Sequence, residues 1–227
     1  MTNFTTDRMF APHTKVDSKD SKLVLANMFW VAFALLIGGS AGLLQTLVRS
    51  GQFELPFGIG YYQLLTLHGV ILALVMTFFF IMGFQIAALS RTAGPLNNKE
   101  RRLGWIGFWV MTVGTLMAAV MIATNEASVL YTFYAPLQAH VIFYIGLTLV
   151  IVGTWLSALG QMMRYFRWRK ENKGQKTPLL SYMTAVNNLM WYVCTIGVAS
   201  TVLFQFIPWS VGWVETINIT PVSYTHL

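Results

Sequence analysis

The sequence predicts an all-α integral membrane protein with five transmembrane helices. Of its 227 residues, 56% are hydrophobic and 10% are charged, whereas about a quarter of an average soluble domain is charged. Five long stretches lack Asp, Glu, Lys and Arg, and the basic residues gather between alternate pairs of these stretches. This composition excludes a soluble two-domain enzyme and a disordered chain. The single cysteine, Cys194, cannot form an internal disulfide.

Each of the five uncharged stretches exceeds the ~20 residues that a helix needs to cross the ~30 Å hydrocarbon layer. In chain order the predicted spans are about 23–48, 61–89, 103–124, 137–163 and 183–207. Residues 1–22 form a polar tail, and no cleavage site of small residues follows the first apolar run, so we interpret that run as an uncleaved span. Gly38 and Gly42 lie four residues apart in this span, which we interpret as close helix packing rather than a cofactor contact.

The basic residues predict the orientation of the chain. If the N-terminus is cytoplasmic, the inner segments are the tail and the loops 90–102 and 164–180, and they carry 14 of the 15 Lys and Arg residues. This asymmetry follows the positive-inside rule and predicts a cytoplasmic N-terminus. The net charge of +7 is therefore a topology signal, with membrane lipid as the expected contact and no nucleic acid as a partner.

His68 is the clearest ionisable side chain inside a predicted span. It follows Tyr61 by seven residues, which places it about 10 Å below the outer end of the second span. Its apolar neighbours cannot accept a ring N–H, and an unpartnered imidazole in such surroundings costs a few kcal/mol. Gly69 leaves room beside the ring for a flat ligand. These features favour an axial ligand of a heme, and a structural hydrogen bond is the alternative.

Two weaker candidates lie near the outer ends of the spans. His140 near the start of the fourth span favours an interfacial role, and its alternative is the sixth ligand of a bis-histidine heme together with His68. The outer loop 125–137 is rich in aromatic residues and contains no basic residue. An aromatic belt at the membrane interface explains this loop by spacing alone. The alternative is a lid over the edge of a heme, in which Tyr131 or Tyr134 donates to a propionate.

Several motifs occur in the order found in one known family. They are Tyr61-Tyr62-Gln63 through Leu67-His68-Gly69-Val70, Asn125-Glu126-Ala127, Leu130-Tyr131-Thr132-Phe133-Tyr134, Pro136-Leu137, Leu179 to Tyr182-Met183, and Pro208-Trp209-Ser210. With these motifs the chain resembles subunit I of the heme–copper oxygen reductases, in particular the B-type cytochrome c oxidases. The resemblance extends over nearly all of the chain after the tail.

The resemblance implies roles for individual residues. His68 matches the axial ligand of the low-spin heme iron, a heme of type a or b, and Gly69 follows it in the same motif. Tyr131 and Tyr134 match the aromatic positions of an outer loop that lies over the heme propionates. Ala135 departs from the family, which often has a second proline there. For the intact enzyme the resemblance implies electron transfer from cytochrome c through a copper-bearing subunit II. It also implies a second heme and copper, which reduce oxygen to water with proton pumping.

The family has twelve or more membrane helices in this subunit, so we expect residues 23–207 to be the five-helix N-terminal part of an oxidase bundle in a prokaryotic plasma membrane. No residue of the oxygen site is expected in this part, and no activity is expected from it alone. Residues 208–227 are expected to be an outer segment whose last residues, 221–227, are non-native. The alternatives are a nitric oxide reductase-like subunit, a complete five-helix bis-histidine b-type cytochrome, and a transporter or scaffold without heme.

Overall fold

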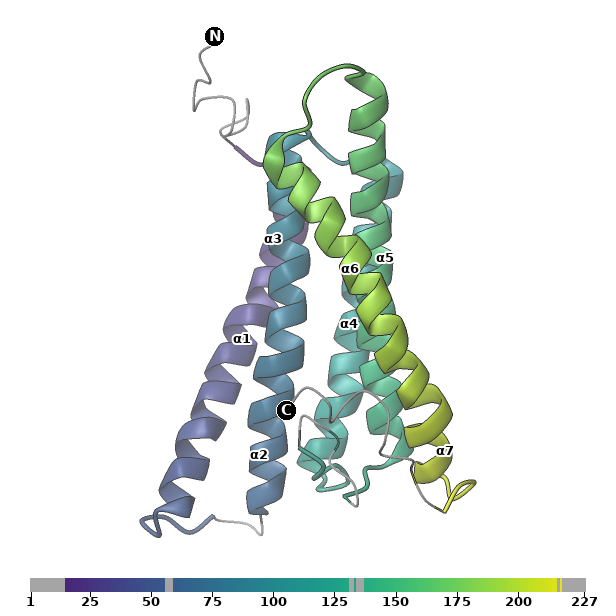
Figure 1. Ribbon diagram of the computed structural model, residues 1–227. Coiled ribbons are helices and arrows are strands. Elements are labelled where there is room, and N and C mark those ends of the chain that lie inside the picture. Colours follow the sequence, from purple (N-terminus) through teal and green to yellow (C-terminus); the bar gives the residue numbers. More distant parts are fainter. Residues whose placement is uncertain (1–14, 56–58, 131–132, 134–136, 216, 218–227) are drawn as a thin grey trace.

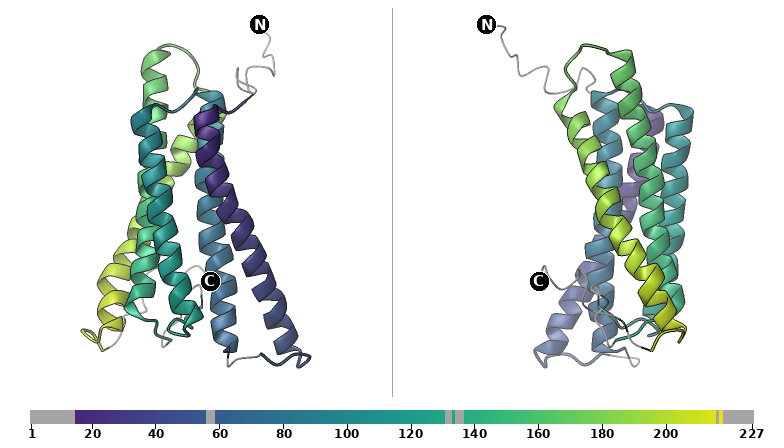
Figure 2. Two further views of the ribbon diagram at one scale, coloured as in Figure 1. Left: turned by 180° about the vertical axis from the view of Figure 1, so that it is seen from behind. Right: turned by 45° about the vertical axis from the view of Figure 1, so that its right-hand side comes forward.

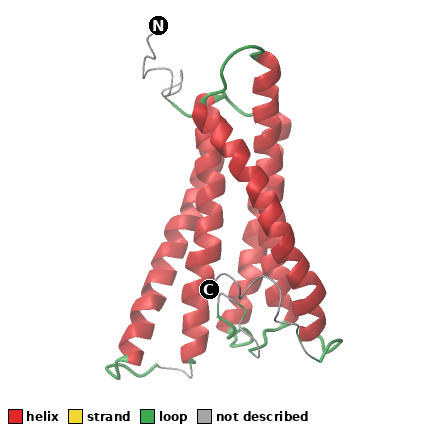
Figure 3. Ribbon diagram, viewed as in Figure 1, coloured by secondary structure: helices red, strands yellow, loops and turns green. Residues whose placement is uncertain are grey.

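The computed structural model describes residues 15–55, 59–130, 133, 137–215 and 217. These residues form helices and no strand, apart from one isolated bridge between Ala127 and Ala139 (Figure 3). Within the described part of the chain, five helical spans are long and apolar enough to cross a membrane. The predicted fold class is therefore confirmed.

Two of the five spans contain a π-helical segment. The helices are α1 (Ser18–Arg49), α2 (Tyr61–Gly69), η3 (Val70–Met76), α3 (Thr77–Thr92), α4 (Asn98–Ala123), α5 (Val141–Glu171), α6 (Leu179–Thr201), η4 (Val202–Phe206) and α7 (Ile207–Ser210). The segments α2, η3 and α3 form one continuous span, and α6, η4 and α7 form another. Pro208 explains the irregular end of the last span, because proline provides no backbone N–H for the helix.

The five spans alternate in direction (Figure 1). The start of α1 and the connections α3–α4 and α5–α6 lie at one end, which we call the basic end. The start of α2, the α4–α5 connection and α7 lie at the opposite end, which we call the aromatic end. α1 packs along α2, η3 and α3, α4 packs along α5, and α6 crosses α5 obliquely (Figures 1 and 2).

The helices depart from the predicted spans mainly at the basic end. α5 continues from the predicted limit at residue 163 to Glu171, so part of the predicted loop 164–180 is helical. α1 begins at Ser18 and α4 at Asn98, both before the predicted limits. The prediction marked the last uncharged residue, whereas a helix continues for as long as its polar side chains find partners.

α4 and α5 approach each other backbone to backbone along a glycine seam, which consists of Gly107 and Gly114 on α4 and Gly146 and Gly153 on α5. A Cβ atom on Gly107 would lie 2.5 Å from the carbonyl oxygen of Gly153, and one on Gly146 would lie 2.7 Å from that of Gly114. Small residues allow such contact between helices in a membrane, where dispersion forces drive helix packing. The spacing of seven residues in each helix keeps the glycines on one face.

At the basic end, a buried carboxylate joins α1 to the α3–α4 connection. Asp20 is fully buried, and it accepts hydrogen bonds from Ser90 Oγ (2.9 Å), the Leu96 backbone N–H (3.0 Å) and Arg101 Nε (2.8 Å). Arg101 also donates from Nη2 to the Leu96 carbonyl oxygen at 2.6 Å. The buried charge of Asp20 is therefore paired and hydrogen-bonded, as burial requires.

A second buried carboxylate joins α4 to α5. Glu100 is 1% exposed, and Arg167 donates to its two oxygens from Nε at 2.9 Å and from Nη2 at 2.8 Å. Glu100 also accepts the Asn97 backbone N–H, which closes a capping box at the start of α4. Arg164 on α5 reaches the α3–α4 connection and donates from Nε to the Gly94 carbonyl oxygen at 2.9 Å. Several residues counted for the orientation therefore also hold helices together.

We predict that Gly153→Ala destabilises the protein by about 1–3 kcal/mol. The added Cβ would lie 2.6 Å from the Gly107 carbonyl oxygen and 2.8 Å from the Met111 backbone nitrogen, so α4 and α5 must separate. The matched control is Gly197→Ala on α6, where the Cβ meets nothing within 4 Å. This control is expected to stabilise its helix by ~0.5–1 kcal/mol. The unfolding midpoints of the two variants are measured by heating the detergent-solubilised protein. Equal midpoints for Gly153→Ala and Gly197→Ala would contradict the close packing of α4 and α5 at the glycine seam.

We also predict that Arg167→Ala lowers the free energy of unfolding by about 2 kcal/mol. This is less than the ~3–5 kcal/mol for breaking a fully buried pair, because the Arg167 side chain is 32% exposed. Adding Glu100→Gln to this variant is expected to recover part of the loss, since it removes the unpaired buried charge. Arg169→Ala is the control, because the nearest partner of Arg169 is the Tyr165 hydroxyl at 3.5 Å. The same unfolding assay measures the double variant. A larger loss of stability in it than in Arg167→Ala alone would contradict the pairing of Arg167 with a buried Glu100 charge.

Candidate functional site

The position of His68 along its span follows from the start of α2. The helix begins at Tyr61, as the sequence predicts, and Gln63 Oε1 accepts the backbone N–H of Gly60 at 3.2 Å to cap that start. His68 is partly buried, and Leu64, Ile71 and Val75 beside it in the sequence are buried apolar residues. The predicted depth of about 10 Å below the end of the helix therefore agrees with the helix bounds.

The imidazole of His68 has one fixed partner. Its Nδ1 lies 2.8 Å from the backbone carbonyl oxygen of Gly38 on α1. A carbonyl oxygen can only accept, so Nδ1 carries the proton and the lone pair lies on Nε2. No group in the described part of the chain is hydrogen-bonded to Nε2. A neutral imidazole with this tautomer is the form that binds a metal ion through Nε2.

This contact bears on the two roles predicted for His68, which are ligation of a heme and a structural hydrogen bond. The sequence around His68 offers no acceptor, and we treated heme ligation and a structural hydrogen bond as alternatives. The acceptor comes from the backbone of α1, thirty residues earlier in the chain. Because it engages only one ring nitrogen, the hydrogen bond and ligation are compatible.

Gly38 and Gly42 allow α1 to approach the second span closely. A Cβ on Gly42 would lie 2.6 Å from both Nδ1 and Cε1 of His68, and one on Gly38 would lie 2.5 Å from Cγ of Leu72. Neither position has room for a side chain. The predicted close packing at these glycines is confirmed. At Gly42 the group packed against α1 is the imidazole of His68, the candidate ligand.

The backbone changes character immediately after His68. Gly69 is the last residue of α2, and η3 begins at Val70. Thr77 Oγ1 donates to the Leu72 carbonyl oxygen at 3.1 Å, five residues back. Short π-helical segments inside α-helices occur frequently at functional sites. The room that Gly69 provides beside the ring stays a prediction.

Two polar residues of α2 hold neighbouring segments against it, Gln63 the end of α4 and Thr66 the outer loop, and neither contact was predicted from the sequence. Gln63 is buried and donates from Nε2 to the carbonyl oxygens of Ile122 (2.6 Å) and Ala123 (3.0 Å) at the end of α4. Thr66 is fully buried, and its Oγ accepts the backbone N–H of Leu130 at 2.9 Å. The available signal was the spacing of two polar residues three apart in an apolar span, which places them on one helix face.

The described part of the outer loop is held in a specific conformation. Leu130 has φ of 63° and Phe133 has φ of 54°, a region that bulky residues seldom adopt. Phe133 packs edge-on against Phe143, Tyr144 and Phe206, with ring centroids 5.7–6.0 Å apart. Tyr131 and Tyr134 lie outside the described residues, so their predicted contact with heme propionates stays a prediction.

His140 has a different role in the fold. It is the N-cap residue of α5, its side chain is exposed, and Nδ1 accepts the backbone N–H of Ile142 at 3.3 Å. This contact requires the opposite tautomer from that of His68, with the proton on Nε2. Helix capping at the aromatic end agrees with the interfacial role and gives no support to a bis-histidine pair.

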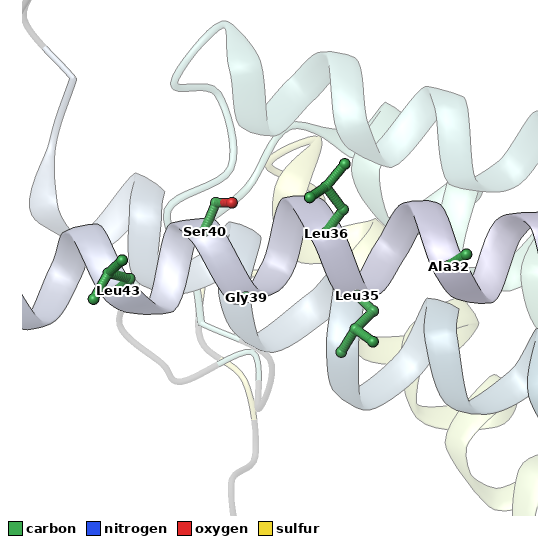
Figure 4. Close-up of a pocket in the computed structure, with 6 residues that line it drawn as sticks. All are labelled: Ala32, Leu35, Leu36, Gly39, Ser40 and Leu43. Atoms are coloured by element: carbon green, nitrogen blue, oxygen red, sulfur yellow. The ribbon is translucent and has the colours of Figure 1, made fainter.

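A shallow apolar groove lies on α1 (Figure 4). Its lining residues are Ala32, Leu35, Leu36, Gly39, Ser40 and Leu43. Gly38 and Gly42, the two α1 residues found next to His68, do not line this groove. The groove and the candidate ligand therefore use different residues of the same helix.

Known proteins similar to this chain share its fold. Cytochrome c oxidase subunit 1 of Thermus thermophilus is 36% identical over 193 residues, which are 82% of this chain and 34% of that protein. Heme-copper oxidase subunit I+III of Aeropyrum pernix is 27% identical over 149 residues, 64% of this chain and 18% of that protein. A solved structure of a heme-copper terminal oxidase dimer matches with a TM-score of 0.83 and 38% identity. The match covers 89% of this chain and 35% of the matched chain of that structure.

The chain thus spans about a third of the length of the Thermus protein. A model of the family described as Cytochrome C and Quinol oxidase polypeptide I matches residues 22–227, which include His68, the last four spans and the first span from residue 22 onward. The fold and this match agree, and the chain belongs to the cytochrome c and quinol oxidase polypeptide I family.

Proposed function

We propose that this chain is the N-terminal, five-helix part of a terminal oxidase subunit and that His68 is the axial ligand of its low-spin heme. The observation that carries the proposal is the Nδ1–H hydrogen bond to Gly38, which leaves the lone pair of Nε2 available to the iron. Histidines that bind metals usually donate their other ring N–H in this way. Membership of a family whose relatives include heme-copper oxidases supplies the identity of the metal group.

The residues around His68 would serve such a heme in separate ways. A low-spin heme provides reversible one-electron transfer when it is bound. Buried Leu64, Ile71 and Val75 keep this part of the span apolar, which is the environment that a macrocycle requires. At the aromatic end, Gln63 holds the end of α4 and Thr66 holds the outer loop at Leu130. We infer that Tyr131 and Tyr134 in this loop contact the propionates.

The rest of the proposal concerns the intact enzyme. Electrons from cytochrome c enter through a copper-bearing subunit II and pass to the low-spin heme and then to a second heme and copper. The ligands of this second centre lie outside residues 1–227. Oxygen is reduced there to water, with proton pumping. The subunit lies in a prokaryotic plasma membrane with its N-terminus in the cytoplasm, as the one-sided distribution of Lys and Arg supports.

We predict that His68→Ala in the intact oxidase removes the low-spin heme, because the change deletes the Nε2 atom that is proposed to bind the iron. Reduced-minus-oxidised spectra and the heme content per subunit measure the loss. His140→Ala is the control, and its spectrum is expected to match that of the wild type. A low-spin heme retained at wild-type level in His68→Ala would sink the proposal. Loss of the heme in both variants would instead favour the bis-histidine alternative.

A second variant separates ligation from folding. His68→Met provides a thioether ligand, and methionine ligation raises the reduction potential of a heme. The variant is therefore expected to retain a heme with a raised midpoint potential. An unchanged potential would show that residue 68 does not bind the iron.

A further inference from the structure

The hydrogen bond of His68 depends on the absence of a side chain at Gly42. In an α-helix the side chain of residue i+4 lies beside the carbonyl oxygen of residue i, which is why Ser and Thr donate to that oxygen. The next turn of α1 shows this geometry, since Thr46 Oγ1 donates to the Gly42 carbonyl oxygen at 2.9 Å. Gly42 has the same relation to Gly38, so a side chain at 42 would cover the carbonyl that His68 uses.

The distances from residue 42 to the His68 ring leave no room for a side chain at Gly42. A Cβ on Gly42 would lie 2.6 Å from Nδ1 and from Cε1 of His68 but 3.5 Å from Cγ. It would therefore meet the edge of the ring that carries the donating N–H. Real Cβ atoms essentially never have neighbours closer than 3.0 Å, so the ring or α1 has to shift, and either shift disturbs the contact of Nδ1–H with the Gly38 carbonyl oxygen.

The other glycines near this contact behave differently. The three atoms nearest to a Cβ on Gly38 would belong to Leu72 and Ile71, and a Cβ on Gly39 would meet nothing within 4 Å. Gly39 lines the groove on α1 instead (Figure 4). Gly83 on α3 also packs against α1, where its Cβ would lie 2.5 Å from Cε of Met28 and 2.9 Å from Cβ of Asn27. Of these four glycines, only Gly42 has ring atoms of His68 among the three nearest neighbours of an added Cβ.

We propose that Gly42 is a positioning residue for the heme ligand: it keeps the Gly38 carbonyl oxygen open to Nδ1–H of His68 and so sets the orientation and the donor strength of the imidazole. The inference rests on the proposed function, in which Nε2 of His68 binds the iron. A hydrogen bond donated from Nδ1 makes Nε2 more basic. A more basic ligand stabilises the oxidised iron more than the reduced iron, which lowers the midpoint potential.

The test compares Gly42→Ala, Gly39→Ala and Gly83→Ala in the intact oxidase by potentiometric titration of the low-spin heme. Changing a group that orients a metal ligand typically weakens binding 10–100-fold. For Gly42→Ala we expect a shift of about tenfold in the ratio of oxidised to reduced heme, or ~59 mV toward higher potential for one electron. Gly39→Ala, on the same helix, and Gly83→Ala, which disturbs packing on α1 away from His68, are expected to keep the wild-type potential.

A double-mutant cycle covers the case in which Gly42→Ala assembles poorly. Methionine at position 68 has no ring and no N–H, so Gly42→Ala should assemble with His68→Met and leave its potential unchanged. A wild-type potential in Gly42→Ala, or an equal shift in the two backgrounds, would overturn the inference and leave the ligand role of His68 intact. Retention of the low-spin heme in His68→Ala would instead overturn the proposed function itself.

Discussion

One constraint explains most of this structure: a polar group inside a membrane has no water to bond with and must find its partner within the protein. Helices satisfy the backbone, and several polar side chains are bonded to the backbone or to each other, although buried Gln85, Thr112 and Thr115 each keep a side-chain oxygen without a hydrogen-bond partner. His68 finds the Gly38 carbonyl oxygen, and Thr66 finds the backbone N–H of Leu130. At the basic end, Asp20 and Glu100 find arginines. Each of these contacts also fixes one helix or loop against another.

Glycine provides two different kinds of contact under this constraint. Along α4 and α5, Gly107, Gly114, Gly146 and Gly153 bring two backbones together over several turns, which gives a rigid pair. Along α1, Gly38 brings the helix close to the second span, and Gly42 exposes a carbonyl oxygen to a side chain of that span. The first arrangement is packing alone. The second combines packing with control over the candidate heme ligand.

The sequence predicted the parts that depend on local composition. The five spans, the start of α2 at Tyr61 and the choice of His68 follow from hydropathy and from the rarity of ionisable residues in lipid. The sequence did not predict the partner of His68, because a backbone carbonyl has no signature among residue types. It also treated Arg101 and Arg167 as topology signals, since the pairing with Asp20 and Glu100 depends on which helices become neighbours. The spacing of seven in the glycine seam is a visible signal in the sequence, and it indicates that these glycines share one helix face.

The identity of the acceptor matters for an electron carrier. A carboxylate beside His68 would strengthen the imidazole further, but a charge at this depth costs at least ~2.5–3.5 kcal/mol in lipid. It would also titrate, and the potential of the heme would then change with pH. The carbonyl oxygen of Gly38 carries no net charge, and α1 holds it in place on both sides. A helix carbonyl opened by Gly42 therefore gives His68 a fixed and neutral acceptor, which suits the proposed heme ligand in both oxidation states of the iron.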